Sequence, residues 1–393
     1  MVTLFPPITR GRIIVFGLAF WYPLAGVTYQ FLHYLIGLRR LGWDVFYVED
    51  SYRAIYDVAT EDYTYDWAST GNIDRVGAVL NAHGFAGKWV AHCHFDRQIW
   101  GMTHTELAEL YRTADVIMHV CGGQEILEEH LAIPRRIYVE TDPVITQIRV
   151  AERNVGVIAT LDVHDTHFSY GENFGHVDCG VPIERYSWLP TRQPVVLDLW
   201  PWDDSPGTTY TTIATWDNKG NDVLWKGEVY SWSKRPEYMK IIHLPRQRDA
   251  VMEVASGIPP EDALTLDQCG WHRRNPIDVS RDIDVYRDYI TSARAELSVA
   301  KEQNIRLRSG WFSDRSCCFL AAGRPVITQD TAFGNILPTG RGLFAFQTMD
   351  DILTAIDMIE TDYAGQRKAA FEIAQEYFAA EKVLKSLCNR AGL

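Results

Sequence analysis

A short polar run near residue 314 has the residue types of an anion-binding site. The run is Ser313-Asp314-Arg315-Ser316, and small, apolar residues follow it from Cys317 to Ala322, with Gly323 next. Ser and Asp favour the start of a helix and Gly favours its end. The first turn of a helix carries unpaired N–H groups and a partial positive charge, which suit a phosphate. Arg315 would add a bidentate contact to the same anion.

A buried strand is predicted directly after this helix. Arg324-Pro325 turns the chain into the short apolar run Val326-Ile327-Thr328. Ligands of open α/β sheets bind in loops at the carboxyl ends of parallel strands. The stretch from Ser309 to Gly334 is therefore read as a loop, a short helix, a turn, a strand and a second loop around which the chain is organised.

The densest polar cluster of the first half lies between His164 and Gly180, where Gly171 and Gly175 suggest a loop bent to approach a ligand. Its order Asp165-Thr166-His167 allows a carboxylate to orient an imidazole for general-base work near neutral pH. Tyr170 and Glu172 follow and are candidates for binding an acceptor. A structural role for the whole cluster is an equally good interpretation.

Two further polar groups follow predicted strands. Asp142 comes after the strand from Arg136 to Val139, where it could take a proton from an acceptor hydroxyl or could cap the next helix. His92 and His94 share one face of the strand from Lys88 to His94, and Asp96 is near, which raises the possibility of a metal site. No third ligand has convincing spacing, so we predict no metal and keep His94 as an acceptor-side candidate.

Length and composition favour two globular α/β domains. The chain has 393 residues, 47% of them hydrophobic and 12% aromatic, and a net charge of −13 without a long basic run. These values argue against disorder and against nucleic acid as the main partner. Seven Cys without CxxC spacing favour a reduced, cytoplasmic protein.

No apolar stretch has the length of a membrane span. Arg10 and Arg12 precede the apolar run from Ile13 to Ala25, as in a signal peptide, but Gly17 and Pro23 interrupt that run. We predict instead a first buried strand over Gly11–Gly17, a helix over Val27–Leu41 and a second strand, which is the opening of a Rossmann-like sheet. The pattern G-x-G-x-x-G is absent, so the sequence gives little support for NAD.

The run from Ser313 through LAAGRPVITQD to Gly334 resembles the nucleotide-sugar half of group 1, family 4-like glycosyltransferases with the two-domain GT-B fold. The resemblance implies two Rossmann-like doubly wound domains that face a cleft, with a last helix that crosses back to the first domain. The expected boundaries are 1–195 for the acceptor domain, 196–207 for the link, 208–375 for the nucleotide-sugar domain and 376–393 for the returning helix.

The sequence departs from the family pattern at two places. Many retaining members carry a Glu in the helix and another Glu eight residues earlier, and inverting members commonly have a His at the earlier place. Aligned on Gly323, these places hold Cys318 and Gly310. The resemblance therefore does not fix the donor contacts or the stereochemical outcome.

The resemblance still implies which loops meet the two substrates. The first loop of the first domain would face the cleft on the acceptor side. Loops of the second domain would meet the diphosphate, the main chain near one strand end would meet the nucleobase, and an amide and an acid would follow the central strand. The acceptor-side residues are Tyr22, Gly26 and Thr28, and the donor-side residues are Lys219, Gly220, Lys234, His272, Ser313, Asp314, Arg315, Ser316, Gln329 and Asp330.

The function expected from this resemblance is transfer of a sugar from a nucleoside-diphosphate sugar, UDP being our guess, to a small-molecule or glycan acceptor. No tightly bound cofactor is required. If the reaction inverts, the base is His167 with Asp165, or Asp142; if it retains, these residues only bind the acceptor. Two alternatives stay open: a nucleotide-sugar epimerase on the same fold, and a non-enzymatic two-lobed protein that binds a small ligand.

Overall fold

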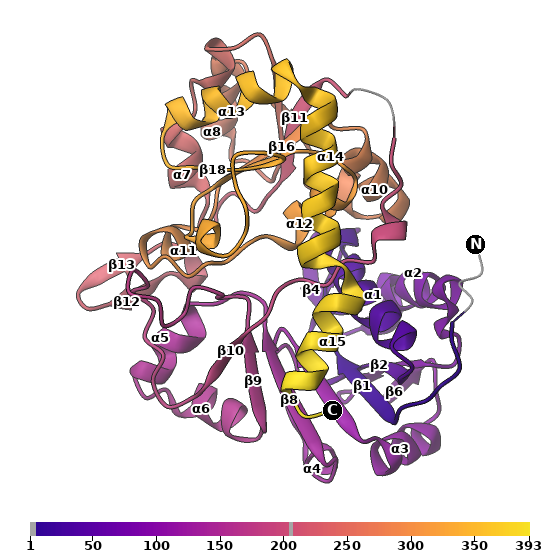
Figure 1. The fold of residues 1–393 in the computed structure, drawn as a ribbon. Helices are drawn as coiled ribbons and strands as arrows, with labels where there is room; N and C mark the ends of the chain where they lie inside the picture. Colours follow the sequence, from indigo (N-terminus) through magenta and orange to yellow (C-terminus); the bar gives the residue numbers. More distant parts are fainter. Residues whose placement is uncertain (1–4, 204–206) are drawn as a thin grey trace.

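The computed structural model describes residues 5–203 and 207–393, with Lys219 described by its backbone alone. Two mainly parallel sheets, each covered by helices, form two lobes one above the other (Figure 1). The predicted link over 196–207 includes residues 204–206, which lie outside the described part. No helix of the described ranges combines the length and apolar character that a bilayer span needs.

The first sheet has eight strands in the order β10-β9-β8-β7-β1-β2-β5-β6, and only β6 runs antiparallel to its neighbour. Alternate residues of β1 enter two different cores, Ile13 and Val15 on one face and Ile14 and Phe16 on the other. A strand that is buried on both faces explains the continuous apolar run in the sequence. The strands are β1 (Arg12–Phe16), β2 (Asp44–Ser51), β5 (Trp89–Cys93), β6 (Gln98–Trp100), β7 (Val116–Val120), β8 (Arg135–Glu140), β9 (Thr166–Ser169) and β10 (Trp188–Pro190).

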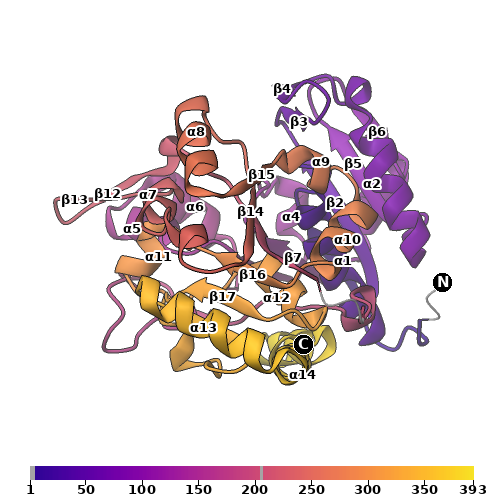
Figure 2. The same ribbon diagram turned by 90° about the horizontal axis from the view of Figure 1, so that it is seen from above.

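Helices and one hairpin complete the first lobe. The helix α1 follows the first strand as predicted, and α3 begins with a capping box between Thr103 and Glu106. The antiparallel hairpin β3–β4 follows β2 and lies at the outer margin of the lobe (Figure 2). These elements are α1 (Ala25–Arg40), β3 (Ile55–Asp57), β4 (Asp62–Thr64), α2 (Asn72–Leu80), α3 (His104–Thr113), α4 (Glu128–Leu131), α5 (Ile145–Ala151) and α6 (Val155–Asp162).

The second sheet has six parallel strands in the order β15-β14-β11-β16-β17-β18. A small hairpin, β12–β13, leaves this lobe between the first strand and the first helix. The strands are β11 (Thr209–Ile213), β12 (Val223–Trp225), β13 (Glu228–Tyr230), β14 (Val251–Ala255), β15 (His272–Arg274), β16 (Ala295–Ser298), β17 (Val326–Gln329) and β18 (Leu343–Phe346); the helices are α7 (Arg235–Lys240), α8 (Pro260–Cys269), α9 (Pro276–Ser280), α10 (Ile283–Thr291), α11 (Glu302–Arg306), α12 (Asp314–Ala321) and α13 (Met349–Thr361).

The stretch around residue 314 has the predicted order of elements. Helix α12 begins at Asp314, Gly323 follows it with φ +65°, and β17 begins at Val326. A side chain at position 323 would collide with the ring of Trp202. The glycine is therefore required both by its left-handed backbone and by close packing against the segment that links the lobes.

One local prediction is wrong. The apolar residues from Ile241 to Leu244 predict a strand, but the structure has a turn there, and the next strand of the sheet is β14, which begins at Val251. Ile241 and Leu244 are apolar because they pack into the core of the second lobe, not because they belong to a strand. The loop expected at Gly171 and Gly175 is present, and strand β9, which carries His167, precedes it.

The chain ends by crossing back to the first lobe, as the resemblance implied. After α14 (Tyr363–Ile373) and a π-helical turn, α15 (Ala380–Arg390) packs against α1 (Figures 1 and 2). The approach is close, because a Cβ added to Gly37 of α1 would lie 2.5 Å from Leu384. A salt bridge of 2.9 Å joins Arg40 of α1 to Glu381 of α15.

Candidate functional site

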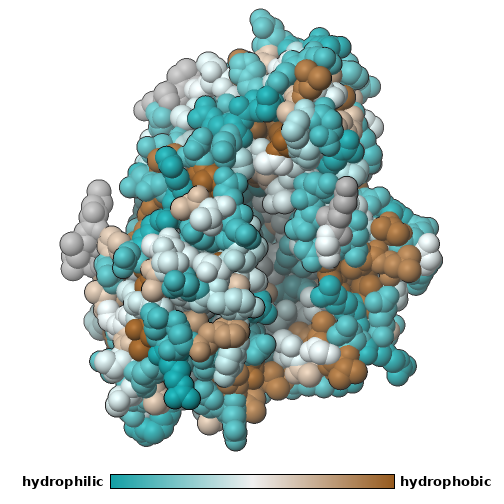
Figure 3. All heavy atoms as spheres, turned by 180° about the vertical axis from the view of Figure 1, so that it is seen from behind, coloured by the Kyte–Doolittle hydropathy of each residue, from teal (hydrophilic) through white to brown (hydrophobic). Residues whose placement is uncertain are grey.

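A cavity of about 510 Å³ lies between the two lobes and is lined by residues of both. The face shown in Figure 3 is hollowed between the lobes. The wall of the first lobe is the loop between β1 and α1, with one tyrosine and one glutamate from the β3–β4 hairpin. The wall of the second lobe includes the segment after β11, Lys234, helix α9 and the start of α12. Lining residues used below are Tyr22, Gly26, Tyr56, Glu61, Trp232, Lys234, Lys301, Trp311, Ser313, Asp314 and Arg315.

The start of α12 lies at the cavity. Ser313, the N-cap residue, lines it together with Asp314 and Arg315, and the Ser313 side chain makes no capping hydrogen bond. The first N–H groups of a helix have no acceptor within the helix, so they are available to a ligand. This part of the structure can bind an anion through backbone groups.

Arg315 is less free than its position suggests. Its Nε donates to Glu296 at 2.5 Å, its Nη2 donates to Ser298 Oγ at 2.8 Å, and its Nη1 donates to the carbonyl of Ile213. Glu296 is fully buried, so the guanidinium compensates a charge inside the protein. The bidentate contact to a phosphate that the sequence suggested competes with these bonds, and Arg315 instead fixes the start of α12 to strands β11 and β16.

Lys234 is a cation of the cavity that forms no salt bridge among the described residues. Its residue is 6% exposed, and its ammonium has no hydrogen-bond acceptor in the described part of the chain. Burial lowers the pKa of Lys234 well below its usual value, and the positive charges of Arg315 and Lys301 lower this pKa further, while the negative charges of Glu296 and Asp142 act in the opposite direction. An anion that entered the cavity would relieve this repulsion, which makes Lys234 the strongest candidate for a phosphate contact.

Lys301 is a second buried cation, and it joins the two lobes. Its ammonium forms an ion pair with Asp142, which follows β8 of the first lobe, and lies 3.2 Å from the centre of the Trp232 ring. Burial lowers the pKa of Lys301. Asp142, one of the two candidate bases, is thus held by a lysine of the opposite lobe at the edge of the cavity.

Asp314 brings a titratable acid to the start of α12. Burial raises the pKa of Asp314 to about 7, and the nearby negative charge of Asp142 acts in the same direction. Near neutral pH this carboxyl group therefore exists in both charge states. In its neutral form it does not repel an anion and can donate a hydrogen bond.

The wall of the first lobe is held by a buried acid. Glu49, near the end of β2, accepts hydrogen bonds from the N–H groups of Phe20 at 2.6 Å and Trp21 at 2.9 Å. Burial raises the pKa of Glu49 to about 7. These bonds fix the loop that carries Tyr22, whose ring stacks on that of Tyr56 with centroids 4.9 Å apart.

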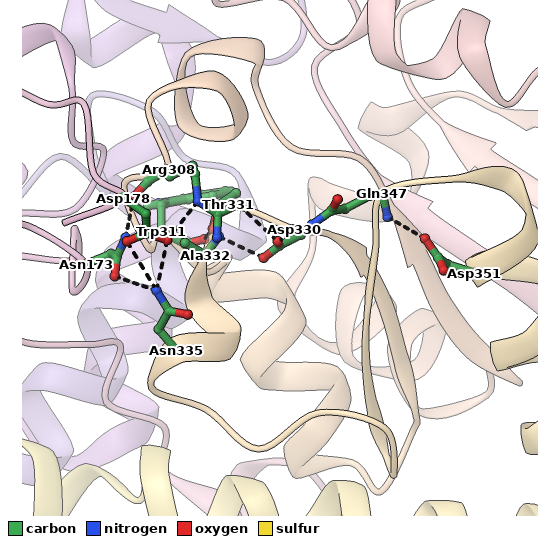
Figure 4. A network of polar contacts seen from close by, with 10 residues as sticks. All are labelled: Asn173, Asp178, Arg308, Trp311, Asp330, Thr331, Ala332, Asn335, Gln347 and Asp351. Atoms are coloured by element: carbon green, nitrogen blue, oxygen red, sulfur yellow. Dashed lines mark hydrogen bonds and ion pairs between the residues drawn. The ribbon is translucent and has the colours of Figure 1, made fainter. Parts of the chain in front are cut away.

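A network of hydrogen bonds and ion pairs also joins the two lobes (Figure 4). Asp178 of the first lobe accepts from Asn173 at 3.0 Å and from Arg308 at 2.9 Å, and Asn335 donates to Asn173 at 2.9 Å. Asp330 accepts from Gln347 at 2.9 Å and is in salt-bridge distance of Arg308 at 3.4 Å. The structure thus places the donor-side candidate Asp330 in this network and not on the cavity lining.

The structure explains one of the two places where the sequence departs from the family pattern. Gly310 has φ +79°, and a Cβ there would overlap the backbone nitrogen of Asn173 in the opposite lobe. A glutamate cannot be accommodated at 310 while the lobes are in this contact. Cys318 is buried in α12 on the side of α1, with its sulfur 4.0 Å from His33 Nε2.

His167 and Asp165 do not form the expected dyad. His167 Nε2 interacts with the carbonyl of Leu161 at 2.9 Å, and Asp165 accepts from the backbone of Arg136 at 2.7 Å. Within the described residues no hydrogen bond joins them, and neither lines the cavity. The sequence order placed them together, but β9 points His167 into a group of aromatic rings that includes Tyr186.

The other site residues predicted from the sequence form two groups, those that line the cavity and those that lie elsewhere. Tyr22 and Gly26 line it, as do Ser313 to Arg315 and Lys234. Others serve the interior: Tyr170 bonds to Tyr34 at 2.7 Å, Glu172 accepts from Arg192 at 2.6 Å, and Gln329 donates to Glu237 at 2.7 Å. Thr28 and Ser316 are buried in helices, His272 is exposed on the edge strand β15, and Lys219 and Gly220 belong to a 3-10 turn. Apart from Lys219, whose side chain lies outside the described part, none of these lines the cavity.

His92 and His94 contact Asp50, not Asp96. His92 Nδ1 lies 2.8 Å from Asp50 Oδ1, and His94 Nε2 is hydrogen-bonded to the same oxygen. The three side chains have ligand atoms within 4.8 Å of one another, as a metal site would. Hydrogen bonds among them already satisfy these atoms, and the bond to Asp50 raises the pKa of His94.

Sequence reasoning missed Lys301, Trp232 and Glu296. The residues from Ala295 to Ala300 predict a strand, and the structure has β16 there, so a lysine after the carboxyl end of a parallel strand was an available signal. Glu296 lies inside that strand, where a charged residue among apolar ones indicates a buried partner. Nothing local identifies Arg315 as that partner.

The two facing lobes and the returning helix define the GT-B fold. No protein-family model matches the chain, and no curated protein matches it in sequence. The structure is similar to an alpha-glucosyltransferase in complex with UDP and a 13-mer DNA containing an HMU base, with a TM-score of 0.59, 13% identity, and coverage of 98% of this chain and 100% of the other.

Two more solved structures have the same overall fold. Sucrose-phosphate synthase from Thermosynechococcus elongatus gives a TM-score of 0.53 at 12% identity, over 97% of this chain and 98% of the other. AviGT4, a glycosyltransferase involved in avilamycin A biosynthesis, gives a TM-score of 0.55 at 10% identity, over 98% of this chain and 97% of the other. The predicted fold class is therefore confirmed, and at these identities the similarity establishes the fold and not the substrate.

Proposed function

We propose that this protein is a glycosyltransferase that moves a sugar from a nucleoside-diphosphate sugar to an acceptor in the cavity between the lobes. The observation that carries the proposal is Lys234, a nearly buried cation that forms no salt bridge among the described residues and lines the same cavity as the open N–H groups at the start of α12. A cation with this environment favours an anionic ligand, and the two groups together suit a diphosphate.

The structural neighbours support the choice of donor. An alpha-glucosyltransferase of the same fold is in complex with UDP, and HepE from Anabaena, at a TM-score of 0.50, is in complex with UDP and glucose. UDP is therefore the first nucleotide to test. The proposed phosphate contacts are Lys234 and the backbone at Ser313 to Arg315, with the nucleobase toward Pro276 and Ile277, which line the same cavity.

The chemistry requires stabilisation of a leaving diphosphate and a place for the proton of the acceptor. Lys234 and the α12 N–H groups would stabilise the developing negative charge. Asp314, near neutral pH, can accept a proton in its ionised form, and Asp142 can do so only if Lys301 releases it. If the configuration is retained, no side-chain base is needed.

The acceptor is proposed to be a small molecule or a glycan, and not nucleic acid. One structural neighbour is bound to DNA. Our chain has a net charge of −13, which opposes binding to a phosphate backbone.

A melting screen over UDP, GDP, TDP, ADP and NAD tests the nucleotide part of this proposal. We expect one nucleoside diphosphate to raise the melting temperature and NAD to leave it unchanged. Incubation with the UDP-sugar alone separates the alternatives, because an epimerase converts the donor without any acceptor. A response to NAD without a response to any diphosphate contradicts the proposal.

A further inference from the structure

Exposed aromatic side chains gather on one surface of the first lobe. Among the residues that the structure describes, the exposed aromatic side chains are Trp202, in the segment between the lobes, and four that lie on this surface. Those four are Tyr52, Tyr63, Tyr65 and Phe95, with exposed fractions of 49% to 58%. We call these four, together with Tyr56 and His94, the aromatic surface. Concentrated apolar exposure of this kind marks a binding site more often than it occurs by chance.

The rings of the aromatic surface form a nearly continuous row. Tyr52 stacks on His94 with centroids 4.4 Å apart and an interplanar angle of 26°. Phe95 lies 6.1 Å from Tyr52 and 4.5 Å from Tyr65. The two rings beyond this group, Tyr63 and Tyr56, are 5.5 Å apart. Tyr63 and Tyr65 are two residues apart in the chain and so connect the two groups.

The row leads into the cavity. Tyr56 lines the cavity together with Tyr22, on which its ring is stacked. A ligand that lay along the aromatic surface could therefore place one end at the cavity, where Lys234 and the start of α12 lie on the opposite wall. This continuity makes the aromatic surface an extension of the candidate site and not a separate patch.

The backbone that carries the row is anchored at its base. The N–H of Tyr56 donates to the carbonyl of Trp21 at 2.8 Å, and Asn72 Nδ2 donates to the carbonyl of Tyr56 at 2.8 Å. The indole N–H of Trp67 donates to the carbonyl of Arg53 at 2.9 Å. The segment is thus fixed relative to the cavity wall, so a ligand need not order it on binding.

The exposed charges around the row are mainly acidic. Glu61, Asp62, Asp66 and Asp96 are exposed beside it, against one exposed base, Arg97, and the half-buried Arg53. These carboxylates repel a phosphate polymer, but they accept hydrogen bonds from hydroxyl groups. Aromatic faces in turn pack against the C–H faces of a pyranose ring. The combination fits an uncharged saccharide better than a nucleic acid or an anionic glycan.

We propose that the aromatic surface binds an uncharged oligosaccharide, whose end residue is the acceptor in the cavity. This inference rests on the proposed function, because it assigns the acceptor of the same site. It names the chemical class of the acceptor and the residues that recognise the part of it outside the cavity.

The test measures binding of the full chain to maltopentaose, cellopentaose and chitopentaose, with a heparin pentasaccharide and a 13-mer DNA duplex as anionic comparisons. The variant Tyr65→Ala/Phe95→Ala removes two rings from the middle of the row. Tyr65→Trp keeps a ring at its place, and Leu264→Ala truncates an apolar side chain that is 60% exposed on the other lobe. UDP binding of every variant is measured in parallel.

We expect at least one uncharged pentasaccharide to bind, and the double variant to weaken this binding by about tenfold. Tyr65→Trp and Leu264→Ala should bind as the unchanged chain does, and all variants should bind UDP equally. The proposal is overturned if none of the three pentasaccharides binds, if the double variant binds them equally well, or if heparin or DNA binds more tightly. If the unchanged chain does not bind UDP, the result contradicts the proposed function instead.

Discussion

The two walls of the cavity differ in their chemistry. The wall of the second lobe presents Lys234 and the open start of α12, with Lys301 and Arg315 near. The wall of the first lobe presents the stacked rings of Tyr22 and Tyr56, and acidic residues surround it. From this difference we propose that the charged substrate, a nucleoside-diphosphate sugar, binds to the second lobe and that an uncharged, hydroxyl-rich substrate binds to the first.

The cations of the second wall differ among themselves. Arg315 compensates the buried Glu296, and Lys301 compensates Asp142, whereas Lys234 has no acidic partner in the described residues. A charge that the protein already uses is a structural element, and one that it leaves unpaired is available to a ligand. Substitution of each cation should therefore distinguish the two kinds, through stability for a structural cation and through nucleotide affinity for a free one.

The change Arg315→Ala should reduce stability more than any other change in the cavity. It would leave Glu296 buried without its partner, which costs about 3–5 kcal/mol in the free energy of unfolding. Urea unfolding of the variant measures this cost. The matched control is Arg273→Ala, whose salt bridge with Asp267 is at the surface and should contribute about 1 kcal/mol or less. Equal losses for the two variants would contradict the assignment of Arg315 as a structural cation.

Lys234→Met should abolish most nucleotide binding without a comparable loss of stability. Removal of a charged contact to the diphosphate should weaken UDP binding by about tenfold to a hundredfold, measured by calorimetry. Because the pKa of Lys234 is lowered in the free protein, UDP binding should also take up protons, which is seen as a dependence of the heat on the buffer. Lys240→Met, at a lysine paired with Glu237 on the same helix, is the control and should bind UDP normally. Unchanged affinity in Lys234→Met would rule out this lysine as the phosphate contact.

The affinity for UDP should fall as the pH rises through about 7, by about threefold to tenfold, because Asp314 becomes negative beside the diphosphate. UDP itself gains charge in the same range, so the informative quantity is the difference between the unchanged chain and Asp314→Asn. The variant should lack the decrease. If both proteins follow the same pH profile, Asp314 does not face the phosphate.

The Asp314 carboxyl should also make the stability of the fold depend on pH. Its pKa is raised in the folded protein, so its contribution to stability is full below the unfolded value near 3.8 and is lost as the pH rises through about 7. The pKa values of Glu49 and Glu140 are also raised to about 7, so a pH profile of the melting temperature reports all three acids together. Asp314→Asn should reduce the slope of this profile between pH 4 and 7 but not remove it.

Tyr56→Ala should have the smallest effect, and it should fall on the acceptor alone. The ring lines the cavity on the first wall and stacks on Tyr22, so its removal should raise the acceptor KM by about threefold to tenfold and leave UDP affinity unchanged. Steady-state kinetics with the acceptor found by the saccharide test would measure this split. A loss of UDP affinity in Tyr56→Ala would mean that the two walls do not divide the substrates as described.

Local patterns in the sequence predicted the parts of the site that are local. The order of Ser313, the short helix, Gly323 and the strand at Val326 follows from capping, glycine and apolar signals within about twenty residues, and the structure has the same order. The opening strand and helix of the first lobe were predicted for the same reason.

Contacts between distant residues could not be predicted. Nothing near Arg315 in the sequence indicates that this residue forms an ion pair with Glu296. Likewise, nothing near Gly310 indicates that Asn173 of the other lobe lies against this glycine. Local order was misleading for Asp165 and His167, because each side chain bonds to a different part of the backbone, Asp165 to Arg136 and His167 to Leu161. For His92 and His94 the nearby Asp96 suggested a partner, but the parallel pairing of β2 with β5 brings Asp50 instead.

The most direct test of the central claim is a crystal structure of the full chain with UDP bound. We predict that the diphosphate lies against the Lys234 ammonium and the first N–H groups of α12, with the acceptor side of the cavity still bounded by Tyr22 and Tyr56. A nucleotide whose phosphates lie against the loop between β1 and α1 of the first lobe, far from Lys234, would contradict the account.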